Sequence, residues 1–380
     1  MNATERAKRH GSVPYYGATG QVGWIDEPLF DEELLLLGED GAPFLDKSKP
    51  IAYVIDGPSW VNNHAHVLRA RPTVASNRYL KYFLDSFDFS DRVGGSTRDK
   101  LTQRDMNSIP VLLAPAEQQR QIVRMLDEIG ARRASVADRL QGVRNFVERL
   151  RVAVLGSAFA QLERTVPVIS LQSVLREPLK NGYSARPVGR VTSTRVLTLT
   201  ATTSGYFDPE HFKYTDDEIP TDSPLWLEPG DILIQRGNTA ELVGMPAVYD
   251  GAPREFIYPD LMIRARVSDG VDPSFVWYML LAPQTRAFLR DRAIGTAGNM
   301  PKINQKTVNA VPLPLPSREE QGNVVRSVKA ALDTADRVGK AISVAETALG
   351  GSVRGALAKA FRGELVPSET EPSVAASWIR

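Results

Sequence analysis

The chain has 380 residues, 42% hydrophobic and 24% charged, an ordinary globular balance that suits roughly two to three domains. It contains no cysteine, which excludes disulfides, thiolate zinc sites and a cysteine nucleophile. The formal net charge is only +1, so contact with nucleic acid would need local basic patches or a basic partner. The polar N-terminus lacks the apolar stretch of a signal peptide, and no run approaches the roughly 20 apolar residues that span a bilayer, so we expect a cytoplasmic protein.

The first 113 residues alternate short apolar runs with Gly, Pro, Asn and Asp, a pattern that predicts short strands joined by turns. We expect strands at 33–37 and 51–55 and a helix at 76–86. These elements predict a first domain of mixed α/β structure over residues 1–113.

A long helix is predicted within residues 114–162, because 117–160 contains no proline and repeats apolar side chains at spacings of three and four. An apolar face of this length must be covered, and the expected cover is a second long helix, packed antiparallel as in a coiled coil. The residues of the face are Ile122, Met125, Leu126, Ile129, Val136, Leu140, Val143, Val147, Leu150, Val154 and Ala158.

Residues 163–315 return to the strand pattern and predict a second mixed domain. Apolar runs predict strands at 196–200, 232–235 and 261–267, followed by a helix at 273–290.

The second long helix is predicted over 316–365, and it leaves a tail at 366–380. Gly350-Gly351 is a point where this helix can bend or break, because glycine is a poor helix former.

The two halves of the chain are copies of one another. Lys100-Leu101-Thr102-Gln103 is matched, 202 positions later, by Lys302-Ile303-Asn304-Gln305. At the same offset Gln119 meets Gln321 and Phe159 meets Phe361, and no gap is needed over about sixty residues. The sequence therefore predicts an α+β fold, in which two mixed α/β domains are separated by two long antiparallel helices in an internal two-fold repeat.

The first copy is the shorter one at its N-terminal end. Nothing before Gly11 matches residues 166–195 of the second copy, and the residues after Leu365 are not expected to replace them.

Motifs that carry catalysis or cofactors are missing from the sequence. There is no phosphate-binding loop, no dinucleotide fingerprint, no nucleophile elbow and no Asn/Asp-Pro-Pro-Tyr/Phe motif of amino-methyltransferases. Pro259-Asp260 could begin a nuclease motif, but no Glu-x-Lys or Asp-x-Lys follows. We expect no catalytic residues and no cofactor.

Two histidines, His64 and His66, lie two residues apart and would share one face of a strand. They could bind a metal, but no third ligand is close in sequence. A structural or DNA-facing role is therefore favoured over a metal site.

Basic and amide side chains gather at three places in the second copy. Residues 180–206 contain cations and no acid, which suits phosphate contact, although a solvated basic loop has the same composition. A turn at 235–238 carries Gln, Arg and Asn, the residues suited to bidentate base contacts, with a polar hairpin tip as the alternative. The small residues of 295–302 allow close approach to phosphate or form a flexible link. The candidates for DNA contact are Lys180, Tyr183, Arg186, Arg190, Arg195, Gln235, Arg236, Asn238, Asn299 and Lys302.

The first copy has candidates of the same kind. Residues 94–100 parallel 295–302, and the polar cluster at 60–66 could face a DNA groove or simply cap a strand. The candidates for DNA contact here are Asn62, Asn63, His64, Arg98 and Lys100.

Three sets of strings resemble the specificity subunits of Type I restriction–modification systems. Residues 11–20, 37–41 and 61–66 are similar to one class of target-recognition domain, and 227–234 with 242–244 to another. Ile109-Pro110-Val111 with Glu117-Gln118-Gln119, and the proline-rich run at 311–316 with Glu319-Glu320-Gln321, are similar to the family's entry into its spacer helices.

The resemblance implies a non-catalytic reader of double-stranded DNA. Two target-recognition domains would each bind half of a split site, and the paired helices would set the number of unread bases between the halves. Tyr16 and Thr19 join the DNA-contact candidates on this ground. Two methyltransferase subunits would bind the helices, and translocase–endonuclease subunits could join them. Because the two copies differ in sequence, the site should be asymmetric.

Three alternatives stay open. A truncated protein of this type would assemble with methyltransferase subunits without recognising DNA, and the short first copy motivates this idea. A fused methyltransferase is disfavoured by the missing motifs, and a structural coiled coil by the basic segment and the repeated domains.

Overall fold

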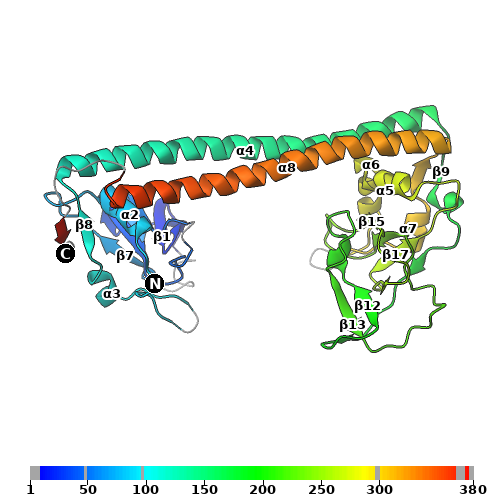
Figure 1. The fold of residues 1–380 in the computed structure, drawn as a ribbon, viewed down its shortest axis with the longest axis horizontal. Helices are drawn as coiled ribbons and strands as arrows, with labels where there is room; N and C mark the ends of the chain where they lie inside the picture. Colours follow the sequence, from blue (N-terminus) through cyan, green and yellow to red (C-terminus); the bar gives the residue numbers. More distant parts are fainter. Residues whose placement is uncertain (1–8, 47–48, 96–97, 296–299, 365–372, 376–380) are drawn as a thin grey trace. The chain divides into compact units, whose positions relative to one another are not determined.

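The computed structural model describes residues 9–46, 49–95, 98–295, 300–364 and 373–375 (Figure 1). The chain divides into two compact units, of which unit 1 comprises residues up to 142 and from 341 onward, and unit 2 comprises 143–340. Both units are of mixed α/β structure, as the sequence predicts. Helix α4 (Ala116–Thr165) begins in unit 1 and ends in unit 2, whereas α8 (Arg318–Phe361) begins in unit 2 and ends in unit 1.

Unit 1 contains two main sheets and two short helices besides its parts of the long ones. One sheet has the order β2-β1-β6-β3 and the other the order β5-β4-β7. All five residues of β4 are buried, which explains its unbroken apolar run. The strands are β1 (Val13–Gly17), β2 (Gly20–Ile25), β3 (Phe30–Asp31), β4 (Leu34–Gly38), β5 (Ala52–Ile55), β6 (Pro58–Val61), β7 (Ala65–Leu68) and β8 (Val111–Leu113), and the short helices are α2 (Asn77–Ser86) and α3 (Gln103–Asn107).

Helix α2 covers the sheet of β4, β5 and β7. Its N-cap is Ser76, whose side chain accepts a hydrogen bond from the amide of Tyr79. Tyr79 and Phe83 lie on the buried face of the helix and pack into the same core as Leu35 and Leu37.

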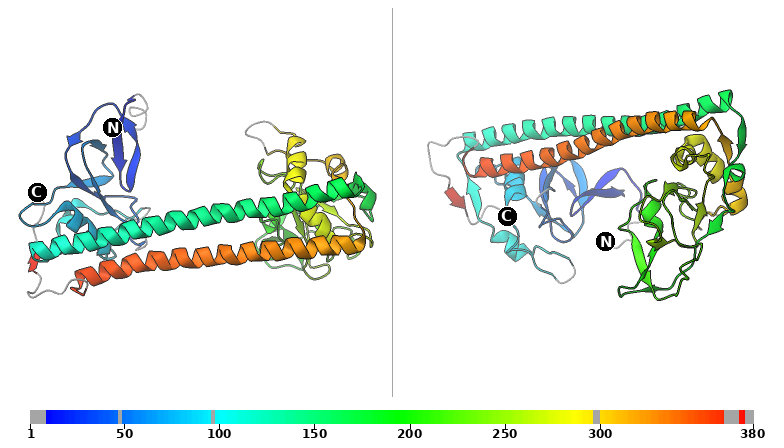
Figure 2. Two further views of the ribbon diagram at one scale, coloured as in Figure 1. Left: turned by 90° about the horizontal axis from the view of Figure 1, so that it is seen from above. Right: turned by 45° about the vertical axis from the view of Figure 1, so that its right-hand side comes forward.

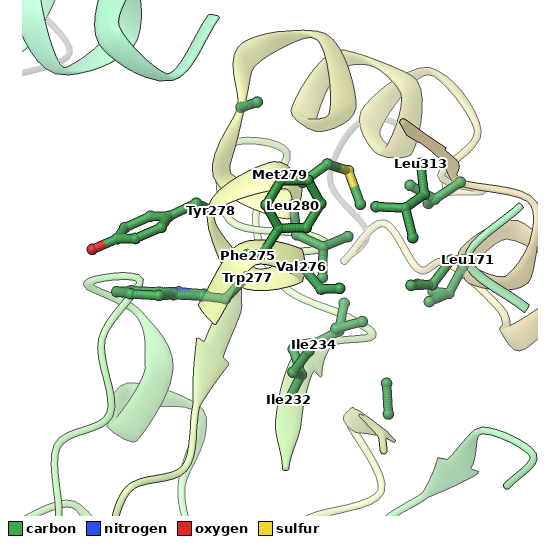
Figure 3. Close-up of a cluster of buried hydrophobic side chains, with 14 of the residues drawn as sticks. Leu171, Ile232, Ile234, Phe275, Val276, Trp277, Tyr278, Met279, Leu280 and Leu313 are labelled. Atoms are coloured by element: carbon green, nitrogen blue, oxygen red, sulfur yellow. The ribbon is translucent and has the colours of Figure 1, made fainter. Parts of the chain in front are cut away.

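Unit 2 contains two four-stranded sheets, of order β10-β17-β14-β15 and β11-β13-β12-β16. Helix α5 (Pro273–Leu281) covers the first of them, with Phe275 and Val276 in the same core as Ile232 and Ile234 (Figure 3). The remaining elements are β9 (Val168–Ser170), β10 (Lys180–Asn181), β11 (Pro187–Val188), β12 (Thr194–Leu197), β13 (Phe212–Thr215), β14 (Ile232–Gln235), β15 (Pro246–Val248), β16 (Phe256–Ile257), β17 (Met262–Ala265), β18 (Pro312–Pro314), α6 (Pro283–Asp291), α7 (Gln305–Asn309) and the 3-10 turns at Leu171–Val174 and Leu199–Thr202.

Corresponding elements follow in the same order in the two units. Strand β1 pairs antiparallel with β2 and parallel with β6, and β12 pairs in the same two ways with β13 and β16. Strands β4 and β7 form an antiparallel pair, as do β14 and β17. Each unit then continues through a helix over the sheet, a short helix, a short strand and a long helix.

The two long helices are antiparallel within each unit (Figure 2). In unit 1, Ile122 near the start of α4 shares a core with Leu357 near the end of α8. In unit 2, Phe159 near the end of α4 shares a core with Val328 near the start of α8. Of the predicted apolar face, Ile122, Leu126 and Val147 are buried, whereas Met125, Val136, Val143 and Leu150 are exposed.

Three local expectations differ from the structure. The helix predicted at 273–290 is two helices, because Pro283 keeps Ala282 in an extended conformation (ψ 140°). Helix α8 does not break at Gly350-Gly351. Packing of the neighbouring Val353 and Leu357 into the core offsets the poor helix propensity of the glycines.

The third difference concerns the tail of the chain. Ser373–Ala375 forms β19, which pairs antiparallel with β8 in unit 1. The equivalent pair in unit 2 is β18 with β9. The expectation that residues after Leu365 replace none of the missing segment is therefore wrong, since they supply the counterpart of β9.

Among the described residues, no helix is long and apolar enough to cross a membrane.

Candidate nucleic-acid interface

Several predicted DNA-contact residues of unit 2 meet at one end of the sheet of β10, β17 and β14. The amide of Gly182 donates to Met262 O (3.1 Å), and the amide of Arg236 donates to Leu261 O (2.7 Å). The segment before α7 joins this edge, because the amide of Ile303 donates to Arg236 O (2.8 Å). Backbone pairing therefore brings Tyr183, Arg236, Asn238 and Lys302 to one sheet end, although they are far apart in sequence. Lys180 lies further into the sheet, where it pairs with Arg264.

The cations at this sheet end are available to a ligand. Lys302 is exposed and Arg236 half-buried, and neither side chain has an ion pair or hydrogen bond within the described part of the unit. Tyr183 is 39% exposed beside them. A polyanion such as a DNA backbone would find unpaired positive charge here.

Gln235 differs from the expectation, because its side chain is fully buried. Its amide nitrogen donates to Leu199 O and to Thr202 Oγ1 (both 2.9 Å), and its amide oxygen accepts from Asn238. A buried amide must satisfy its hydrogen bonds internally, so Gln235 holds the turn in place and does not face a ligand.

The basic segment of unit 2 is largely neutralised by acids from other strands and loops. Arg190 pairs with Asp216 (2.8 Å), and Arg195 pairs with Glu255 (3.0 Å) while its guanidinium lies over the ring of Phe256. The backbone amide of Arg186 donates to Asp217, but its side chain is exposed. Local composition could not reveal these long-range ion pairs.

Predicted residues of unit 1 gather at the matching sheet end. The amide of Glu39, just after β4, donates to His64 O (2.8 Å), and the amide of Leu101 donates to Glu39 O (2.7 Å). The amide of Asn62 donates to Tyr16 O (3.0 Å), which brings the end of β1 to the same place. Asn63 and Thr19 are exposed on the adjoining turns, and Lys100 on the segment before α3.

Acids and cations are paired at this sheet end. Glu39 pairs with Lys100 (3.0 Å), and Asp40 Oδ1 lies 2.7 Å from His64 Nδ1, at hydrogen-bond distance. His66 is turned inward, with Nε2 2.9 Å from Leu101 O. Among the described residues no group of histidines and carboxylates could hold a metal.

Two predicted residues lie apart from these clusters. Arg98 is exposed in the turn that precedes Lys100. Asn299 lies outside the described residues.

Comparison with known proteins matches the chain to one family. The family model described as Type I restriction modification DNA specificity domain matches residues 2–144. The EcoKI specificity subunit of Escherichia coli K12 is 24% identical over 316 residues, which cover 79% of this chain and 68% of that protein. Residues 2–144 thus match the DNA specificity domain of Type I restriction–modification systems, and most of the chain is similar to a specificity subunit of such a system.

Solved structures share the fold of this chain. A structure on complex assembly and conformational transition of the type I R-M system has a TM-score of 0.64 at 16% identity, with 94% of this chain and 93% of that chain covered. The HsdS subunit of Thermoanaerobacter tengcongensis has a TM-score of 0.53 at 17% identity, with coverage of 95% and 93%.

As members of a non-catalytic family, specificity subunits leave methylation and cleavage to other subunits. DNA recognition is the role that follows from the family for this chain. The alternative that it only assembles with methyltransferase subunits is not favoured.

A buried charge network behind the sheet end of unit 2 was not predicted from the sequence. Arg264 is 1% exposed and donates to Glu177 (2.7 Å), and Arg266 makes two hydrogen bonds to Asp231 (2.5 and 2.9 Å). Burial lowers the pKa of Arg266, but the hydrogen bond and charge of Asp231 outweigh it and leave that pKa above its usual value. The network links the segments of β10, β14 and β17. Its only signal in the sequence is that Arg264 and Arg266 are two residues apart in a predicted strand, on the same face.

Proposed function

We propose that this specificity subunit binds a split, asymmetric DNA site through the two equivalent sheet ends, one in each unit. The observation that carries the proposal is that each sheet end gathers predicted contact residues from three or more separate segments. Lys100 and Lys302, which hold the same backbone position, would contact phosphates, and the amide and aromatic side chains around them would contact bases.

The domain plan that we propose follows the internal repeat. Residues 1–113 and 163–315 are the two target-recognition domains, 114–162 and 316–365 are the spacer helices, and 366–380 is a tail. The matching order of elements in the two units supports the repeat. The antiparallel spacer helices would fix the number of unread bases between the half-sites.

The proposed partners are two methyltransferase subunits, with translocase–endonuclease subunits joining in the cytoplasm. A groove of about 440 Å³ in unit 1 supports docking of a partner next to the long helices. Helices α2, α4 and α8 all line it, with Leu126 and Val353 on its apolar surface and Lys81, Arg133 and Arg354 among its charged residues. Such a mixture of apolar area and charge is typical of a protein interface.

The test is methylome sequencing of a host that expresses this chain with its cognate methyltransferase subunit, against a host that lacks only this chain. We expect N6-methyladenine at one split, asymmetric motif, and only when the chain is present. A complex that purifies intact but methylates no motif would overturn the proposal in favour of an assembly-only role. A palindromic motif would contradict the asymmetric pair of readers.

A further inference from the structure

Glu39 in unit 1 and Arg236 in unit 2 occupy the same backbone position. Each follows the central strand of its sheet, and each donates its amide to the residue before the neighbouring strand, at 2.8 Å for Glu39 and 2.7 Å for Arg236. Each accepts a hydrogen bond from the residue after the matching lysine, Leu101 (2.7 Å) or Ile303 (2.8 Å). Both backbone groups of each residue are therefore fixed in the sheet.

The matching lysines confirm this equivalence. Lys100 forms β-bridges with Gly94 and Asp40, and Lys302 forms them with Ile294 and Gly237. Asp40 and Gly237 directly follow Glu39 and Arg236, so the two sheet ends have the same pattern of backbone pairing.

The side chains at this shared position have opposite charge. Glu39 is 27% exposed and pairs with the 49% exposed Lys100. Arg236 has no acid partner among the described residues, and neither has Lys302. A partly exposed ion pair such as Glu39–Lys100 contributes little to stability. The carboxylate and the ammonium can therefore separate at little cost, and each can bind a group of a ligand instead.

We propose that Glu39 and Arg236 are specificity-determining residues for the two half-sites. Arg236 forms a forked pair of hydrogen bonds to O6 and N7 of a guanine, and Glu39 accepts a hydrogen bond from the N4 amino group of a cytosine. Lys100 moves from Glu39 to a phosphate on binding, and Lys302 contacts a phosphate directly. This inference rests on the proposed placement of the DNA interface.

Opposite charge at one backbone position gives the two units different base preferences without any change of fold. A carboxylate near DNA repels phosphates. At this position it therefore needs the amino group of a base to donate a hydrogen bond to it. The same reasoning excludes a phosphate contact for Glu39, whereas Arg236 could make either kind of contact.

The experiment compares the methylation motif of the wild type with those of Glu39→Gln and Arg236→Gln, each co-expressed with the methyltransferase subunit. We expect Glu39→Gln to relax one cytosine position in one half-site, and Arg236→Gln to relax one guanine position in the other. The preference at that base should fall about tenfold or more, while the other half-site stays unchanged. Glu27→Gln and Arg176→Gln, exposed positions away from the sheet ends, are matched controls that should leave the motif intact.

Purified complexes separate this inference from the proposed function. Oligonucleotides with each base change at each half-site position are bound to the wild-type and variant complexes, and the differences in affinity give the coupling between side chain and base. Glu39→Asp replaces Glu39→Gln if that variant fails to assemble. Weaker binding to all sequences without a changed motif would make Arg236 a phosphate contact, and an unchanged motif in both variants would remove both residues from recognition. In either case the specificity role of the chain would stand. Absence of any motif with the wild type would instead remove the proposed function, and this inference with it.

Discussion

The two sheet ends share one backbone and differ in their charges. In unit 1 Lys100 has Glu39 beside it, whereas in unit 2 Arg236 and Lys302 have no acid partner among the described residues. Behind the sheets the two units differ in burial. Unit 2 buries the pair Arg266–Asp231, while in unit 1 Arg69, which follows β7 as Arg266 follows β17, pairs with Glu32, and these two side chains are 46% and 44% exposed. The backbone frame therefore constrains the position of a residue but leaves the charge at that position free to vary.

The largest effect should come from breaking the buried network. Asp231→Ala removes both hydrogen bonds that Arg266 donates to this carboxylate and the one from the amide of Glu228, and it leaves Arg266 with the longer contact to Glu177 (3.2 Å). This loss should lower the free energy of unfolding of unit 2 by about 3–5 kcal/mol. Glu32→Ala removes the exposed counterpart in unit 1 and should lower it by less than about 1 kcal/mol. Hydrogen exchange on peptides from each unit measures both values, and equal losses in the two units would contradict the contrast.

Truncation of the phenylalanine that is repeated in the two units should also destabilise unit 2 more than unit 1, by a smaller difference than the buried network. Phe159 is 1% exposed and packs on Phe275, so Phe159→Ala should destabilise unit 2 by about 3 kcal/mol. Phe361 is only partly buried against Tyr79 and Phe83, so Phe361→Ala should have about half that effect on unit 1. Thermal unfolding monitored with unit-specific proteolysis would distinguish them, and a larger loss from Phe361→Ala would reverse the expected order.

The repeated glutamines should behave alike in the two units. Gln119 donates to Val74 O and Ala114 O, and Gln321 donates to Pro316 O and accepts from the amide of Asp272. Replacement of either by leucine leaves buried backbone groups unpaired and should destabilise its unit by about 1–3 kcal/mol. Urea unfolding of the two variants and of the exposed control Gln172→Leu tests this, and a neutral result at either site would mean that water replaces the side chain.

The smallest effect concerns the salt dependence of DNA binding. Lys302→Gln should lower the slope of log Kd against log salt by about one, because it removes one phosphate contact. Lys100→Gln should lower it by about the same amount, since Lys100 leaves Glu39 for a phosphate when DNA binds. Titrations at several salt concentrations measure both slopes. A clearly smaller drop for Lys100→Gln would show that Glu39 keeps Lys100 paired in the complex.

The sequence by itself determined the order of elements, the two long helices and the family. These features depend on local periodicity and on repeated strings, which need no knowledge of distant contacts. Gln119 and Gln321, aligned from the repeat alone, both lie buried at the start of a long helix.

Only the tertiary structure decided which polar residues face outward and which charges are paired. Gln235 has the composition of a base-reading residue, yet strand pairing places it in the core. Arg190 and Arg195 belong to a segment without acids, yet Asp216 and Glu255 reach them from other parts of the sheet. Side-chain charge can be deduced from the sequence, but the partner of each charge depends on contacts between residues far apart in the chain, and those exist only in the folded state.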